Sequence, residues 1–280
     1  MAFVISGVIF VGGMLGAPGF SSAHSLYIQS SRYTVHDGKK SPLFFCYGHH
    51  IPVDDGLRAK KIKQIRVYAP DGKWSEVAVR PDTCLQSHMV AYDQPGTWVL
   101  TAETNPGYYT VYTDFKGRER HTIKPKTAIK DQAKSIEKSL YSSQFTKTYV
   151  VCDTPSETFP AQVGLTLELV PQTDISTVKA GETLTLKVYY KGKPYMGKGT
   201  WDATYSGFST ASEDNYYPKT EVIGDTVNLF VPNTGRWFVR YFFKTDATGE
   251  ALKHCTQIKH TATLVFEVPN ARKRPGKGGH

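Results

Sequence analysis

Cysteine is scarce in this chain of 280 residues, and no two cysteines are spaced as a C-x-x-C pair. Without that spacing we do not expect a zinc site built from thiolates. The four cysteines are Cys46, Cys84, Cys152 and Cys255. An even number fits two disulfides if the chain is exported. The sequence leaves their pairing open, and we favour Cys46 with Cys84.

Common catalytic motifs are also missing. The sequence has no G-x-S-x-G, no H-E-x-x-H, no phosphate-binding glycine loop and no dinucleotide-binding fingerprint. The carboxylates of Asp54 and Asp55 are neighbours in a turn. Glycoside hydrolysis instead needs two carboxylates on opposite sides of a bond. We therefore do not expect an enzyme.

Charged side chains are absent from residues 1–23. The stretch from Ala2 to Leu15 is almost wholly apolar, and Ser21-Ser22-Ala23 supplies the small residues of a cleavage site. This pattern predicts a signal peptide over 1–23 and a periplasmic, exported protein. The alternative is an uncleaved anchor, which Pro18 and Gly19 disfavour by interrupting the apolar run. No later segment is apolar enough to span a membrane, so we expect no integral membrane protein after cleavage.

The formal net charge is +9. It comes from the part of the chain after the leader, with basic residues gathered in 116–138 and in the tail over 270–280. The tail lacks large apolar residues, which predicts disorder. We interpret the charge mainly as a source of solubility, with an anionic lipid or glycan partner as the alternative. We expect no nucleic-acid partner.

Strand-like runs rich in Val, Ile, Tyr and Phe recur about every ten residues, with turn residues between them. This rhythm predicts an all-β fold of two tandem immunoglobulin-like β-sandwich domains. We place an N-terminal β-sandwich with the candidate metal site over 24–160 and a C-terminal immunoglobulin-like β-sandwich over 161–269. The polar, proline-containing stretch at 153–162 is the expected linker.

One segment departs from this rhythm. Ile129, Ala133, Ile136 and Leu140 are spaced by four, three and four residues, and Thr127 precedes them as a possible cap. The spacing predicts a single short amphipathic helix packed on the sheet late in the first domain.

Histidines are the side chains whose placement suggests a function. Cleavage after Ala23 would make His24 the first residue, whose amine and imidazole can close a chelate ring on Cu, Ni, Co or Zn. His49 and His50 stand where a predicted strand ends and point to opposite faces, so we expect only one of them to join a site. We favour His49, because Gly48 before it permits close approach. His88 is the fourth candidate metal ligand. The alternative is that these histidines only form structural hydrogen bonds.

A family resemblance rests on short motifs spread over the chain after the leader. These are Ala23-His24-Ser25-Leu26-Tyr27, Tyr47-Gly48-His49-His50, Pro95-Gly96-Thr97-Trp98, Leu165-Thr166-Leu167-Glu168-Leu169-Val170-Pro171, Ala180-Gly181-Glu182 and Lys191-Gly192-Lys193-Pro194. The set resembles the periplasmic component family of ATP-driven cobalt and nickel uptake systems, which is otherwise a domain of unknown function.

The resemblance implies a tandem β-sandwich whose recurrent histidines correspond to His24 and His49. It also implies nickel or cobalt as the cargo and a membrane metal-uptake transporter as the partner. Two other functions stay open. One is a copper-binding β-sandwich enzyme or carrier that uses a terminal histidine, similar to polysaccharide monooxygenases. The other is a ligand-free structural or adhesive sandwich.

Overall fold

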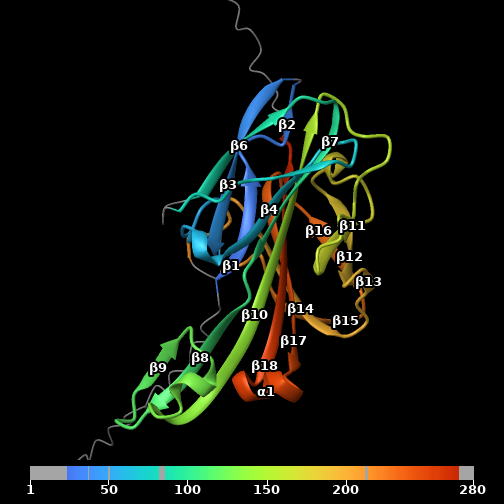
Figure 1. Cartoon of the computed structure of the whole chain (residues 1–280). Coiled ribbons are helices and arrows are strands. Elements are labelled where there is room, and N and C mark those ends of the chain that lie inside the picture. The colour runs from blue at the N-terminus through green and yellow to red at the C-terminus, as the bar shows by residue number, and fades with distance from the viewer. Residues whose placement is uncertain (1–23, 37, 50, 82–85, 212–213, 271–280) are drawn as a thin grey trace, which may run out of the picture.

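The computed structural model describes residues 24–36, 38–49, 51–81, 86–211 and 214–270. The leader over 1–23 and the tail from 271 onward, both interpreted above, lie outside these residues. The described chain is mostly β-structure arranged in three sheets (Figure 1), so the predicted all-β, sandwich-like fold is confirmed. No helix among the described residues is long and apolar enough to cross a membrane.

The first sheet is small and has the strand order β1-β3-β6. Its strands are β1 (Ser25–Ser30), β3 (Lys39–Gly48) and β6 (Gln86–Tyr92). β1 pairs antiparallel with β3, and β3 pairs antiparallel with β6. Every residue of β1 is buried, which is unusual for an edge strand and shows that its second side is covered.

The second sheet has eleven described strands and runs through the whole molecule. Its main order is β15-β14-β17-β18-β10-β7-β4-β5. The bounds are β15 Tyr217–Ile223, β14 Lys198–Tyr205, β17 Gly235–Asp246, β18 Gln257–Val268, β10 Ala133–Cys152, β7 Gly96–Thr104, β4 Ile62–Tyr68 and β5 Trp74–Glu76. Three further strands join it at β10 or β8, namely β2 Thr34–Val35, β8 Gly107–Asp114 and β9 Glu119–Thr122.

The third sheet consists of β11 (Leu167–Pro171), β12 (Glu182–Tyr190), β13 (Lys193–Pro194) and β16 (Thr226–Val231). Short helical segments complete the described chain. They are the α-helix α1 (Gly249–His254) and the 3-10 turns η1 (Ala59–Lys61), η2 (Lys126–Ile129) and η3 (Ile175–Thr177). β12 alternates buried Leu184, Leu186 and Val188 with less buried neighbours, as expected for a strand with one face on a core.

Two large hydrophobic cores and a smaller third cluster lie between these sheets, and the third contains Tyr27, Cys46, Phe238 and Val265. The first joins the first sheet to the β4–β7–β10 part of the large sheet, and it contains Leu26, Ile28, Phe45, Val67, Trp98, Leu100 and Val150. The second joins the third sheet to the β14–β17–β18 part, and it contains Leu167, Leu186, Leu229, Trp237, Val239, Tyr241, Leu264 and Phe266. Each such side chain contributes about 1.5–3 kcal/mol when removed from water.

The strand β10 replaces the predicted helix, so that prediction is wrong. Only the turn η2 is helical there, and a continuous strand begins at Ala133. The reason is pairing on both sides. β8 hydrogen-bonds to the first part of β10, and β18 pairs with it from Leu140 to Thr148. These ladders outweigh a local helical spacing, because tertiary contacts routinely override weak propensity.

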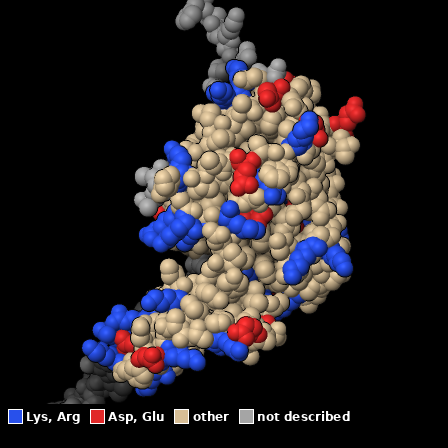
Figure 2. All heavy atoms as spheres, in the orientation of Figure 1, with Lys and Arg blue, Asp and Glu red and all other residues tan. Residues whose placement is uncertain are grey.

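β10 also connects the two halves of the molecule. It pairs antiparallel with β7 of the first half and parallel with β18 of the second. The expected linker at 153–162 thus follows a strand that is hydrogen-bonded to both sandwiches. The β8–β9 hairpin, paired through β8 with the start of β10, projects beyond the sandwiches (Figure 1). Figure 2 shows Lys and Arg side chains gathered on this hairpin among fewer acidic ones.

The expectation of two disulfides is not met. Cys46, Cys152 and Cys255 are buried free thiols in this structure, so the two disulfides, which would need all four cysteines, are not present. The favoured partner of Cys46, Cys84, lies outside the described residues. The cores described above are large enough to hold the fold without such crosslinks.

Candidate metal centre and adjoining pocket

His24 and His49 lie side by side at one end of the first sheet. The antiparallel register pairs Ser25 with Gly48, so the residue before β1 meets the residue after β3. The centroids of the two imidazole rings are 4.6 Å apart, and their planes are inclined at 66°. Tyr47 also contacts His24 edge-on, with ring centroids 5.5 Å apart. Residues 25 positions apart in the chain are thus brought together by one strand pair.

The backbone of β1 is held by side chains of the large sheet behind it. Gln144 accepts a hydrogen bond from the Leu26 N–H at 2.5 Å and donates one to the His24 carbonyl at 3.0 Å. The Thr263 hydroxyl donates to the Leu26 carbonyl at 2.7 Å. Thr146 accepts from the Ile28 N–H at 3.2 Å. These bonds satisfy the outer edge of β1 and fix where His24 emerges.

A buried ion pair also holds the start of β1 in place. The Arg240 guanidinium donates to both carboxylate oxygens of Asp202, with an Nη2–Oδ2 distance of 2.5 Å. Both side chains are almost wholly buried. Arg240 also donates to the Ser25 hydroxyl at 3.2 Å. Because planar guanidinium–carboxylate contacts fix geometry as well as charge, Ser25 is held in one place beside His24.

The loop after β3 positions His49. The His49 N–H donates to the Asp54 carboxylate at 2.7 Å, and the Asp54 N–H donates to the Tyr27 hydroxyl at 3.1 Å. Gly48 is required between them, because a side chain at that position would overlap Asp54. His49 is only 6% exposed, whereas His24 is exposed. One ring is therefore buried in the protein and the other faces solvent.

The Asp54 carboxylate is engaged by the His49 N–H, and two further nearby groups supply no anionic ligand. Burial raises the pKa of the Cys46 thiol to about 11, so it stays protonated at neutral pH. Burial also raises the pKa of Tyr27 well above its usual range, so its hydroxyl stays neutral. The site thus depends on imidazole nitrogens, which suit Ni, Co, Cu and Zn.

The other two predicted ligands are placed differently. His88 lies within β6 and pairs with Leu43 of β3, and Leu43 precedes His49 by six residues. At about 3.3 Å per residue it stands roughly 20 Å from the histidine pair. Desolvation lowers the pKa of His88, as expected for a half-buried imidazole. His50 lies outside the described residues. Over the described part of the chain, no group of three or more His, Cys, Asp and Glu is arranged to hold a metal.

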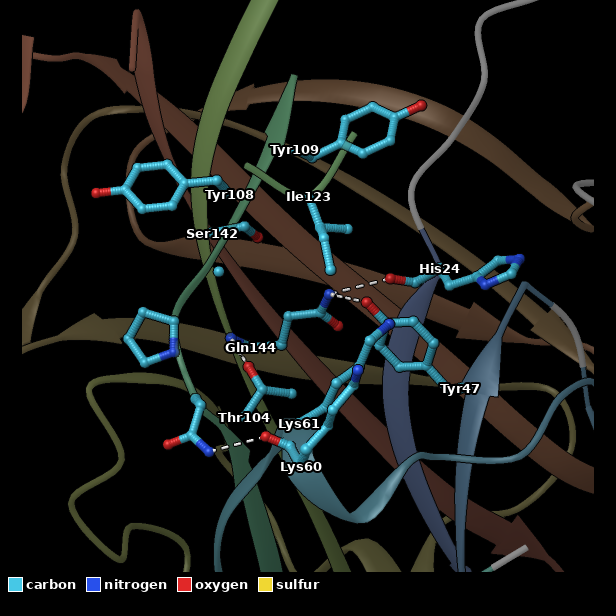
Figure 3. A pocket seen from close by; sticks show the side chains of 13 residues that line it. His24, Tyr47, Lys60, Lys61, Thr104, Tyr108, Tyr109, Ile123, Ser142 and Gln144 are labelled. Atoms are coloured by element: carbon cyan, nitrogen blue, oxygen red, sulfur yellow. Dashed lines mark hydrogen bonds between the residues drawn. The ribbon is translucent and has the colours of Figure 1, made fainter. Parts of the chain in front are cut away.

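A pocket of about 550 Å³ lies beside the histidine pair (Figure 3). It opens between the end of the first sheet and the projecting hairpin. Its wall is formed by His24, Tyr47, Lys60, Lys61, Thr104, Asn105, Pro106, Gly107, Tyr108, Tyr109, Ile123, Ser142 and Gln144. In Figure 3 the His24 ring points away from the pocket, while its carbonyl points toward Gln144.

Sequence reasoning did not find this pocket. Its wall combines a 3-10 turn, β7, β8 and the middle of β10, which are far apart in the chain. The adjacent Tyr108 and Tyr109 were the one local signal, because two neighbouring aromatic rings on a strand cannot both enter the same core. The wall depends on the β8–β10 pairing, and the predicted helix would have excluded that pairing.

The fold and site define an all-β protein of two joined sandwiches with a histidine pair at the open end of one sheet. The chain belongs to the DUF4198 family, a domain of unknown function whose sequence model matches residues 21–245. No curated protein matches the chain.

Two solved structures are similar in part. A DUF4785 family protein from Legionella pneumophila is 10% identical, with a TM-score of 0.23, and the match covers 76% of this chain and 50% of that one. This chain thus spans about half the length of the Legionella protein. The FN1–FN3 domains of chicken CNTN1 are 6% identical, with a TM-score of 0.23, covering 89% of this chain and 69% of that one.

Proposed function

We propose that this protein is a periplasmic carrier that captures Ni(II) or Co(II) and passes it to a membrane uptake transporter. The observation that supports the proposal is the 4.6 Å separation of the His24 and His49 rings. Imidazole nitrogens bind such ions at about 2.0–2.1 Å. When two imidazoles bind one ion with an angle of about 90° at the metal, their ring centroids are roughly 4.5 Å apart. The observed spacing fits two imidazoles on one ion.

The remaining ligands would come from the chain itself and from water. Cleavage after Ala23 frees the amine of His24, which completes a chelate ring with its own imidazole. His49 then adds a third nitrogen from a position that the Asp54 carboxylate fixes. The exposure of His24 leaves one side of the ion open, as a carrier needs in order to release its cargo. The resemblance to cobalt and nickel uptake components supports the identity of the cargo.

A thermal-melt panel tests this function. The mature chain beginning at His24 is melted with Ni, Co, Cu and Zn in turn. An ion at 100 times its Kd raises the free energy of unfolding by about 2.7 kcal/mol, because it binds only the folded state. For a protein of this size that raises Tm by roughly 5–10 °C. We expect the shift with Ni or Co.

Two variants and one control complete the test. One extra residue before His24 displaces the amine, and His49→Ala removes the second imidazole, so both should abolish the shift. His36→Ala is the matched control, because His36 is exposed and contacts Asp153 elsewhere. The proposal fails if no metal raises Tm, or if both altered chains respond like the unaltered one. A shift with Cu alone would instead support the copper alternative.

A further inference from the structure

The wall of the pocket carries positive charge. Lys60 and Lys61 contribute two ammonium groups, and none of the described wall residues is Asp or Glu. Neither lysine has a carboxylate within ion-pair distance among the described residues. Burial and the nearby Arg58 lower the pKa of Lys61, and Asp55 only partly opposes them. A bare cation entering here would be repelled, and an anion would be attracted.

Several other polar groups of the wall are already occupied by the fold. The Asn105 amide donates to the carbonyls of Lys60 and Ile62, both at 3.1 Å. Thr104 accepts from the Gln144 N–H at 3.1 Å. The Gln144 side chain holds β1, as described above. The two ammonium groups are therefore the principal groups available to bind the charge of a ligand.

The rest of the wall is aromatic or aliphatic. The Tyr108 ring leans on Tyr141, with centroids 4.8 Å apart, and Lys61 lies 3.9 Å from the centre of the Tyr47 ring. Ile123 is 73% exposed although it borders the pocket. Covering this exposed apolar side chain with a ligand is favourable, because it removes apolar surface from water. Tyr108, Tyr109 and Ile123 thus offer a surface for a flat apolar body.

From this arrangement we infer that the pocket binds a small organic anion, with its apolar body between Tyr108 and Ile123 and its charge at Lys60 and Lys61. The volume of about 550 Å³ is within the range of small-molecule sites and far larger than a single ion needs. This binding requires no metal, and in Figure 3 the His24 ring points away from the pocket.

The test uses 8-anilinonaphthalene-1-sulfonate, which joins two aromatic groups to one sulfonate. Its fluorescence is titrated with the folded chain in the presence of EDTA, so that metal binding does not contribute. We expect saturable binding to one site. The double variant Lys60→Met and Lys61→Met keeps the side-chain length and removes both charges. It should weaken binding about tenfold, whereas Lys63→Met, a lysine paired with Glu103 outside the pocket, should not.

A neutral probe separates charge from hydrophobicity. N-phenyl-1-naphthylamine has the same rings without the sulfonate and should bind at least about tenfold more weakly. Equal binding of both probes, or an unchanged affinity in the double variant with an unchanged melting curve, would overturn the inference. A double variant that does not fold is replaced by Tyr108→Leu, which should weaken binding of the sulfonate probe. None of these outcomes bears on metal capture, because EDTA is present throughout.

Discussion

At the scale of single residues, Lys259 places an ammonium group in a largely buried position. It is 8% exposed, its ammonium lies 4.5 Å from the centre of the Phe242 ring, and no described carboxylate pairs with it. Burial, followed by the charges of Arg240, Lys244 and Lys138, lowers its pKa to about 7, and Asp202 only partly opposes this. The folded protein therefore holds this lysine partly neutral at physiological pH.

The pH dependence of stability follows from that pKa. Between pH 7 and 10 the unfolded chain keeps a proton on Lys259 that the folded chain has lost, so stability attributable to this residue rises with pH. Lys259→Met removes the cost of the buried charge. We expect it to stabilise the protein, with a gain about 2–4 kcal/mol larger at pH 6 than at pH 10.

Urea unfolding at both pH values measures this gain, and Lys253→Met on α1 is the control because Lys253 is exposed and paired with Glu250. A gain independent of pH would contradict the account of Lys259.

At the scale of elements, the loop after β3 sets the position of His49. Gly48→Ala would push the new methyl group into the Asp54 side chain, which holds the His49 N–H. We expect a loss of about 1–3 kcal/mol in the free energy of unfolding and weaker metal binding, because His49 must move. Gly107→Ala is the matched control, since a side chain there meets open space. Denaturation curves that show equal losses in the two variants would rule out this role for Gly48.

Several strands were predictable from their runs of β-branched and aromatic residues. Among the strand-like runs rich in Val, Ile, Tyr and Phe, those predicted over 62–69, 97–103 and 226–231 become β4, β7 and β16 with almost the same bounds. A strand over 145–152 was predicted and forms the second part of β10. The first part was not predictable, because it has a helical spacing and is held as a strand by partners distant in sequence. The same long-range pairing forms the pocket, so the sequence could not indicate it.

The histidine pair was predictable only in part. A strand that starts just after His24 and another that ends just before His49 can place the two rings together, but the antiparallel register that does so depends on the fold. His88 sits on a strand of the same sheet, and only the register shows that it lies away from the pair.

At the scale of the whole molecule, β10 links both sandwiches. It contributes Val150 to the first core and Phe145 and Tyr149 to the second, and it is hydrogen-bonded to β7 and β18. Unfolding one sandwich would expose part of the strand that stabilises the other. We expect the mature chain to melt in a single calorimetric transition, with equal calorimetric and van't Hoff enthalpies. Two separate transitions would instead show that the boundary near residue 160 divides independent domains.

The central claim is that His24 and His49 bind one metal ion. X-ray absorption at the nickel edge, on the mature chain loaded with one equivalent of Ni(II), counts the imidazoles around the ion directly. The account predicts two imidazoles in the unaltered protein and one in His49→Ala. A spectrum with no imidazole scattering, or one that His49→Ala leaves unchanged, would contradict it.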